Sequence, residues 1–287
     1  MHCVLAFRIS SSAIKPVYFN NNINNTFIRS GSGDQHATDM EILAIERDQA
    51  FGSRSEIEID GTGLYDINPL SLQTYRRRVQ QYNNELPYNN LNDEDFCKKT
   101  GITLHGHLTY GGLLMLGKRD SVHEYVRNFW IDYIEIPGTS YTNASERYNY
   151  RMPEQDNIWE SYQVLIQRLR LYVNNPYKAG PDGFAPDDNS QLYCIREGLV
   201  NMCAHADYFS PMHYTIRVFS DRIEFQNPGM FIIDLNEVKE RNVSFPRNPT
   251  IINLFRYAKL SEDAGYGIDK ILRWKKLTGN EVVFNTN

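Results

Sequence analysis

The stretch of residues 190–228 constrains the fold more than any other part of the chain. It begins with an amphipathic helical pattern, in which apolar residues recur every three or four positions. This apolar stripe consists of Leu192, Ile195, Leu199, Met202, Cys203 and Ala206. Two strand patterns follow at 214–219 and 222–225, joined by Ser220 and Asp221. The sequence therefore predicts a buried helix followed by a β-hairpin.

A second stripe lies roughly opposite the apolar one and carries Glu197, Asn201 and His205, spaced four residues apart. A carboxylate four residues before an amide reaches the same point in space, so the two groups can hold a water molecule and a divalent cation. The alternative is an ordinary solvent-exposed helix face. The spacing alone favours neither interpretation.

The composition limits the classes of protein to which the chain can belong. Its 287 residues suffice for two modest domains with hydrophobic cores. With 30 basic and 35 acidic side chains the formal charge is −5, so no global basic field indicates a nucleic-acid partner. No apolar run approaches the roughly 20 residues of a membrane span, and residues 1–10 lack a signal-peptide pattern. The four cysteines lack the paired spacing of zinc sites, so we expect a cytoplasmic protein with reduced thiols.

The N-terminal part predicts an incomplete sheet. Strand patterns at 3–10, 16–20 and 26–33 precede a short amphipathic helix expected over 36–49. Three strands that open directly at the start of the chain leave a sheet edge open and a face without a covering helix. We therefore expect the first part of this domain to be missing. The segment 60–63 resembles a phosphate loop, but it precedes no helical pattern, which favours a plain turn.

The middle of the chain predicts short helices separated by turns, and one strand over 129–138. The helices are expected over 68–82, over 91–101, after an N-cap at Thr109, and over 157–173. Three consecutive arginines, Arg76–Arg78, favour a solvated helix face over a nucleic-acid contact.

The C-terminal part combines a long loop with a glycine-opened helix. The loop 174–189 is rich in proline, glycine and acidic residues, which makes it a candidate lid or partner-binding segment. Gly265 and Gly267 open an amphipathic helix whose free N–H groups can bind a phosphate, although Gly-x-Gly before a helix is a weak signal by itself. The other expected elements are helices over 235–241 and from Pro249, and a closing strand over 280–284.

Four segments, taken together, resemble the motifs of a divergent GHKL-type ATPase domain, a superfamily that includes gyrase and histidine kinases. Residues 197–208 (EGLVNMCAHADY) are similar to its E-A-x-x-N-A-x-x-H-R-D-Y box, and residues 225–229 (FQNPG) to its N-P-G turn. Residues 247–249 (RNP) resemble its R-N-P segment, and residues 262–268 (EDAGYGI) its E-x-x-G-x-G-I segment. They follow one another in the order that the family has.

Two upstream segments extend this resemblance. Residues 107–118 (HLTYGGLLMLGK) are similar to the segment that precedes the ATPase domain, and residues 15–33 to the closing strands of a Schlafen-type AlbA-like domain. Bacterial proteins with this architecture are described as transcriptional regulators, in a group also described as RecG-related. The resemblance implies three regions: an AlbA-like remnant over 1–63, a helical connector with one strand over 64–138, and a nucleotide-binding domain over 139–287.

The fold class that the resemblance implies is α+β or α/β. Its C-terminal domain would be a Bergerat-type α/β sandwich, in which helices cover one face of a mixed sheet. ATP or ADP with Mg²⁺ would be the cofactors of such a domain.

The resemblance also implies roles for individual residues. Glu197 would be the catalytic residue that positions or deprotonates the attacking water, and Asn201 would hold Mg²⁺ against the phosphates. The other cofactor-binding positions would be His205 and Asp207 in support, Asn227 and Gly229 at the adenine, and Gly265 and Gly267 at the phosphates. A separate metal site of His205, Asp207 and His213 is conceivable by ligand type, but no further ligand is evident.

Three departures from the family pattern weaken the case for turnover more than the case for binding. Ala206 stands where the family has arginine, and Cys203 replaces a small aliphatic residue. Asn227 stands at the adenine turn where active enzymes have aspartate, so its carbonyl can still face the adenine but carries no negative charge.

We therefore expect a cytoplasmic transcriptional regulator, with DNA or RNA as a partner of its AlbA-like portion and a nucleotide domain that acts as a sensor or a weak ATPase. One alternative is a degenerate fold that serves only for homodimerisation or protein interaction, without a nucleotide. Another is a Schlafen-like nucleic-acid processing factor whose active part lies outside the chain.

Overall fold

The computed structural model describes residues 16–20, 22–30, 33–42, 45, 54–173, 190–228, 246–261 and 267–285. The chain divides into two compact units, Met1–Gly52 and Ser53–Asn287, which we describe separately. Among the described residues, no helix combines the length and the apolar character that crossing a membrane requires.

The first unit contains an antiparallel hairpin of β1 (Phe27–Ser30) and β2 (Gly33–His36). A single-turn helix, η1 (Ile23–Asn25), precedes it and is capped by the side chain of Asn22. The strand expected over 16–20 is reduced to one bridge, between Tyr18 and Thr26, because the backbone groups of residues 19–26 bond to one another in the turn around η1. Residues 39–42 and 45 are helical, but His36, where the helix was expected to begin, belongs to β2 instead. Residues 3–10 lie outside the described part of the chain.

The second unit is built around a four-stranded mixed sheet with the strand order β6-β5-β7-β8. Its strands are β5 (Ile131–Glu135), β6 (Tyr150–Arg151), β7 (Tyr214–Val218) and β8 (Ile223–Gln226). Strands β5 and β7 run parallel to each other, while the two outer pairs are antiparallel. The predicted mixed sheet and the β7–β8 hairpin are therefore confirmed.

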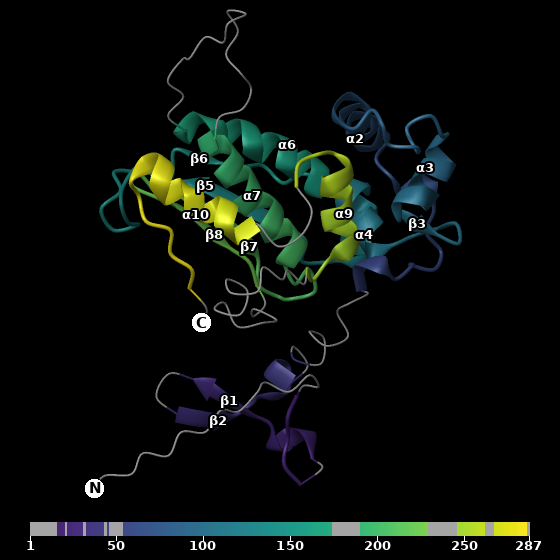
Figure 1. The fold of residues 1–287 in the computed structure, drawn as a ribbon. Helices are drawn as coiled ribbons and strands as arrows, with labels where there is room; N and C mark the ends of the chain where they lie inside the picture. The colour runs from purple at the N-terminus through teal and green to yellow at the C-terminus, as the bar shows by residue number, and fades with distance from the viewer. Residues whose placement is uncertain are drawn as a thin grey trace, which may run out of the picture. The chain divides into compact units, whose positions relative to one another are not determined.

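Helices α6 (Ile158–Leu169), α7 (Ser190–His205) and α10 (Gly267–Thr278) lie on one face of this sheet (Figure 1). The register places Tyr133, Ile216 and Phe225 on the face that the helices cover, and Phe225 lies next to Gly198 of α7. Alternation along a strand sends Asp132 and Arg217 to the opposite face, where their side chains form an ion pair of 2.7 Å. The predicted α/β sandwich, with helices on one face, is confirmed.

The helices before the sheet begin and end at the capping residues that the sequence offers. Asn68 caps α2 (Pro69–Tyr82), Asn92 caps α3 (Asp93–Thr100), and Thr109 caps α4 (Tyr110–Leu116), each through its side-chain oxygen. Gly101 ends α3 with a φ of +77°, a left-handed conformation that favours glycine. The remaining elements of this part are η2 (Arg54–Glu56), η3 (Leu64–Asp66), β3 (Thr103–Leu104), β4 (His107–Leu108) and α5 (Arg119–Tyr125).

One hydrophobic core joins these helices to the sheet and its covering helices. Tyr75 of α2 is fully buried against Trp159 of α6, and its hydroxyl donates to the carbonyl oxygen of Leu254 at 2.8 Å. Leu254 lies in α9 (Pro249–Tyr257), the helix that the sequence predicts from Pro249. The domain boundaries predicted after residues 63 and 138 stay predictions, although side chains from both sides of residue 138 share this core.

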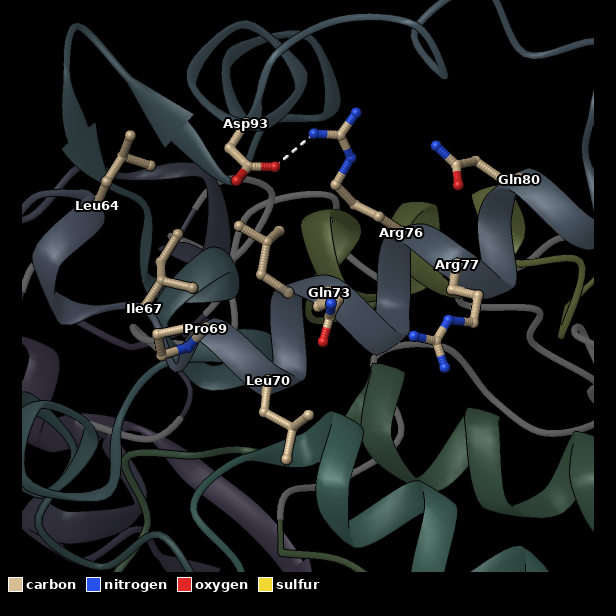
Figure 2. Close-up of a pocket in the computed structure, with 10 residues that line it drawn as sticks. Leu64, Ile67, Pro69, Leu70, Gln73, Arg76, Arg77, Gln80 and Asp93 are labelled. Carbon is tan, nitrogen blue, oxygen red and sulfur yellow. Dashed lines mark hydrogen bonds and ion pairs between the residues drawn. The ribbon is translucent and has the colours of Figure 1, made fainter.

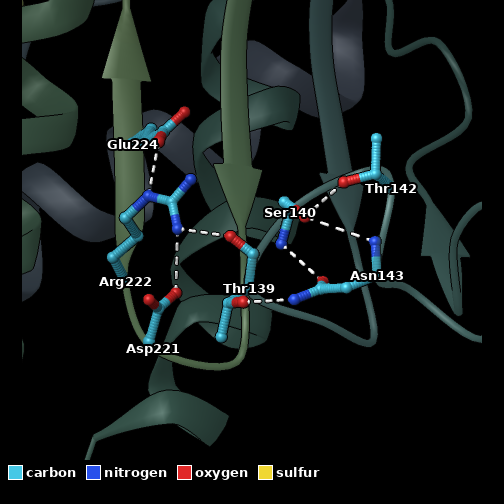
Figure 3. A network of polar contacts seen from close by, with 7 residues as sticks. All are labelled: Thr139, Ser140, Thr142, Asn143, Asp221, Arg222 and Glu224. Carbon is cyan, nitrogen blue, oxygen red and sulfur yellow. Dashed lines mark hydrogen bonds and ion pairs between the residues drawn. The ribbon is translucent and has the colours of Figure 1, made fainter.

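A polar network fastens the segment after β5 to the β7–β8 turn (Figure 3). Arg222 donates to the carbonyl oxygen of Thr139 at 2.7 Å and pairs with Asp221 and Glu224 at 3.0 and 2.6 Å. The side chain of Asn143 holds the other end of the segment, since it accepts from the backbone N–H of Ser140 at 2.8 Å. The turn and the segment are thus held together at the end of the sheet.

The expected closing strand over 280–284 is wrong, because residues 280–285 have no regular secondary structure. Glu281 of this segment pairs with Lys275 of α10 at 2.6 Å, and Val283 is exposed to solvent. The segment 60–63 forms a turn rather than a phosphate loop, with the hydroxyl of Thr62 bonded to the carbonyl oxygen of Ile59. The loop 174–189 and the helix expected over 235–241 lie outside the described residues.

Two helical glycines should respond in opposite ways to alanine. A Cβ at Gly112 in α4 would lie 2.2 Å from the carbonyl oxygen of Ile102, whereas a Cβ at Gly198 in α7 would lie 3.7 Å from the Phe225 ring. We expect Gly112→Ala to lower the free energy of unfolding by about 1–3 kcal/mol through overpacking. Gly198→Ala should raise it by up to about 1 kcal/mol through helix propensity. Urea unfolding of both variants measures the two signs, and a shift in the same direction would contradict the packing described here.

Candidate functional site

Helix α7 carries the central pair of the candidate site, Glu197 and Asn201. Glu197 is 5% exposed, and Asn201 is half-buried one turn further along. The side-chain amide of Asn201 donates through Nδ2 to Oε1 of Glu197 at 3.1 Å. The stripe that contains them is therefore not an ordinary solvent-exposed face, because its first member is buried.

Gly267, the first residue of α10, lies directly against this pair. A Cβ at Gly267 would stand 2.8 Å from Oε1 of Glu197 and 2.9 Å from Nδ2 of Asn201. Only glycine lets the start of α10 approach the two side chains so closely. The first N–H groups of a helix have no partner within the helix and carry partial positive charge, so the start of α10 favours anionic groups.

Lys270 adds a full positive charge one turn into α10. Within α10, all of which the structure describes, Lys270 is the buried side chain, with 6% exposure. Its Nζ lies 5.2 Å from the centre of the Tyr193 ring, and Tyr193 precedes Glu197 on α7 by one turn. Sequence reasoning missed Lys270. The available signal was its position three residues after Gly267, on the same face of the helix.

The segment Arg247–Pro249 ties down the end of α7. The backbone N–H of Asn248 donates to the carbonyl oxygen of Ala204 at 2.9 Å, and its side chain donates to that of Ala206 at 2.8 Å. Arg247 donates to the carbonyl oxygen of His205 at 2.8 Å. These carbonyls at the helix end have no partner within the helix, so the segment supplies the donors that they lack.

His205 and Asp207 lie at this same end of α7. Burial, together with the nearby Arg247 guanidinium, lowers the pKa of His205 from 6.5 to about 4, so the imidazole is neutral at physiological pH. Asp207 is 4% exposed, and its backbone N–H donates to the carbonyl oxygen of Pro228 at 3.1 Å. This bond joins the turn after β8 to the end of α7.

The structure separates the predicted site residues into two groups along α7. Glu197, Asn201 and Gly267 meet near the middle of the helix, whereas His205 and Asp207 lie near its end. His205 lies eight positions after Glu197, which corresponds to about 12 Å along the helix. Gly229 and Gly265 lie outside the described residues.

Asn227 lines a small cavity of about 300 Å³ next to the sheet. Its other lining residues are Asp132, Met212, His213, Thr215, Arg217, Gln226 and Pro228. Pro228 therefore belongs both to this cavity and to the contact with Asp207 at the end of α7. Neither Glu197 nor Asn201 lines this cavity.

A larger and more open cavity, of about 820 Å³, runs along α2 and contains none of the predicted site residues (Figure 2). Apolar side chains such as Ile67 and Leu70 line one part of it, and Arg76 pairs with Asp93 at its edge. Arg76 also donates to the carbonyl oxygens of Asn89 and Leu91, so this arginine holds the α2–α3 loop.

The described residues include no group of three or more histidine, cysteine, aspartate or glutamate side chains that could hold a metal ion. The conceivable site of His205, Asp207 and His213 is therefore not formed. Because Nδ2 of Asn201 is bonded to Glu197, its carbonyl oxygen Oδ1 is the atom that suits a hard cation. Mg²⁺ commonly takes few protein ligands and completes its shell with phosphate oxygens and water, which fits this donor set.

Comparison with known proteins supports the predicted ATPase-like domain. Residues 212–285 match the family described as "Putative ATP-dependent DNA helicase recG C-terminal". This range contains β7, β8, α9 and α10, so the C-terminal part of the chain is ATPase-like. Residues 43–132 match a family described as "Domain of unknown function (DUF8451)", which says nothing about an AlbA-like domain.

The fold also resembles that of a solved bacterial structure. The DIP2311 protein from Corynebacterium diphtheriae matches with a TM-score of 0.60 and 19% sequence identity, over 88% of this chain and 49% of that one. At this identity the match shows the fold alone, and the chain spans about half the length of that protein. None of the curated proteins matches the chain.

The lowered pKa of His205 predicts a pH dependence of stability. Between the unfolded value of 6.5 and the folded value of about 4, the unfolded chain binds more protons at this position. The stabilisation is complete above about pH 6.5 and is lost as the pH falls toward 4, up to about 3 kcal/mol in all. Urea unfolding at pH 7 and pH 4.5 should show a smaller loss in His205→Gln than in the wild type. Equal losses in the two proteins would contradict the assignment.

Proposed function

We propose that the C-terminal part of this chain binds a Mg²⁺-nucleotide, and that it acts as a nucleotide sensor or weak ATPase in a transcriptional regulator. The observation that carries this proposal is the approach of Gly267 to both Glu197 and Asn201 at the start of a 12-residue helix. A carboxylate, an amide oxygen and a helix N-terminus at one point make a site suited to a cation and a phosphate chain.

The charges around the start of α10 support a phosphate end near Gly267. Lys270 and the start of α10 supply positive charge, and the carbonyl oxygen of Asn201 supplies a neutral ligand for the cation. Phosphoryl transfer depends mainly on positioning and on the neutralisation of developing charge, which these groups can provide. Glu197 is the candidate to orient the attacking water. We assign it only weak turnover, because it is buried and already accepts a hydrogen bond from Asn201.

The base of the nucleotide would then lie toward the end of α7. The hydrogen bond between Asp207 and Pro228 brings the Asn227-Pro228 turn to that end. The neutral imidazole of His205 lies there as well, and a neutral ring suits a base better than a charged one does. In this orientation one nucleotide would contact both groups of predicted residues, which lie about 12 Å apart along the helix.

Transcriptional regulation, with nucleic acid bound through residues 1–63, rests on the family resemblance. The arginines of α2 support it little, because Arg76 pairs with Asp93 and Arg78 is half-buried rather than displayed on the surface. We therefore assign any nucleic-acid contact to a part of the protein other than α2.

Nucleotide binding should be visible as thermal stabilisation. Millimolar Mg-ATP should raise the Tm of the wild type, because a ligand that binds only the folded state stabilises it. Asn201→Ala should abolish the shift by removing the cation ligand, and Gly267→Ala should abolish it by pushing a methyl group between Glu197 and Asn201. Glu197→Gln should keep the shift but lose ATP hydrolysis.

The matched control is Asn280→Ala, which removes an exposed amide beyond the end of α10 and should behave as the wild type. The absence of any Mg-ATP shift in the wild type would sink the nucleotide proposal and favour a protein-interaction role for the fold. A shift that survives both Asn201→Ala and Gly267→Ala would place the nucleotide elsewhere.

A further inference from the structure

Two half-buried arginines from different helices influence the same tyrosine, Tyr162. Arg196 belongs to α7 itself, and Arg78 comes from α2. Burial raises the pKa of the Tyr162 hydroxyl to about 12. The positive charges of Arg196 and Arg78 both oppose this rise in pKa. Burial lowers the pKa of Arg78, and the Arg196 guanidinium lowers it further. The two cations are therefore near enough to repel each other.

Neither guanidinium is neutralised by a carboxylate of the described residues. Arg78 donates through Nε to the carbonyl oxygen of Ala258 at 3.2 Å and stacks over Tyr82 at 3.4 Å. Arg196 stacks over Tyr193 at 4.5 Å, and its Nε is buried without a hydrogen-bond acceptor. Other arginines of the described residues do pair with a carboxylate, among them Arg76 with Asp93, Arg168 with Glu135, and Arg217 with Asp132.

Lys270 brings a third cation to the same aromatic ring. Its Nζ lies 5.2 Å from the centre of the Tyr193 ring, so that this ring lies within cation–π distance of both Lys270 and Arg196. Three elements that are distant in sequence, α2, α7 and α10, thus each contribute one positive charge here. The sequence alone does not predict that these three side chains lie near one another, because no two of them belong to one motif.

Partly buried like charges cost free energy unless an anion compensates them, and a buried N–H without an acceptor costs more. The planar guanidinium fork matches the oxygen atoms of a phosphate, and it can offer two parallel hydrogen bonds. We propose that Arg78 and Arg196, with Lys270 beside them, form a binding subsite for a phosphate group. The subsite takes this anion either free or as part of a nucleotide, and it needs neither Mg²⁺ nor Asn201.

The first test measures binding of inorganic pyrophosphate without Mg²⁺. Calorimetry and thermal shift on the wild type are compared with NaCl at matched ionic strength, and the wild type should bind pyrophosphate beyond the salt effect. Arg196→Gln and Arg78→Gln should each raise the Kd at least tenfold. Lys98→Gln, which removes an exposed charge on α3, should leave the Kd unchanged.

The second test uses the sign of a stability change. In the absence of ligand, Arg196→Met should keep or raise the Tm, because it removes the repulsion with Arg78 and the buried donor without an acceptor. A purely structural arginine would give the opposite sign. A lowered Tm together with wild-type pyrophosphate affinity would overturn the proposal, as would a wild type that binds no better than NaCl allows.

Competition identifies the source of the phosphate. If ATP without Mg²⁺ displaces pyrophosphate, the subsite accepts the phosphate chain of a nucleotide; if it does not, the subsite takes a free phosphate anion. Both results support the subsite. Asn201→Ala separates this proposal from the nucleotide proposal, because it should lose the Mg-ATP shift and retain pyrophosphate binding. Loss of pyrophosphate binding in Asn201→Ala would count against an independent subsite.

Discussion

The contact between the start of α10 and the middle of α7 is the interaction on which the candidate site depends. Gly267 can stand where it does because it has no side chain, and the space that it leaves is filled by Glu197 and Asn201. The same contact brings Lys270 to the ring of Tyr193. A larger residue at position 267 would separate the helices and would move the lysine, the carboxylate and the amide apart together. The geometry of the site is therefore set by packing rather than by any single hydrogen bond.

The other end of α7 is fixed by different means. Three carbonyl groups, those of Ala204, His205 and Ala206, accept from Arg247 and Asn248, residues that are some forty positions away in sequence. Asp207 then binds the carbonyl oxygen of Pro228 through its backbone N–H. The R-N-P and N-P-G segments thus meet at the C-terminal end of one helix. Two segments that lie far apart in the sequence are thereby brought to one end of α7.

Local signals in the sequence predicted much of this fold. The apolar stripe of α7, the N-cap at Thr109 and the glycine that ends α3 each depend on neighbours within a few residues, so a single sequence contains the necessary information. Long-range partners were not predictable in this way. The strand expected over 280–284 did not form, and the pairing of Arg76 with Asp93 depends on how α2 meets α3. The burial of Lys270 follows from the approach at Gly267, which only the packed helices reveal.

Buried charged groups around α7 cost free energy at a helix interface. Replacing a buried charged group by an apolar one of similar volume is often neutral or stabilising, so buried charges are weak evidence for stability. Here Glu197 and Lys270 are both nearly inaccessible, and Arg196 adds a donor without an acceptor. Sequences break local rules of this kind mainly where function requires it. Glu197 and Arg196 lie on α7, which also carries Asn201, and Lys270 lies on α10 beside it. This arrangement is the physical reason for our proposal of a charged ligand.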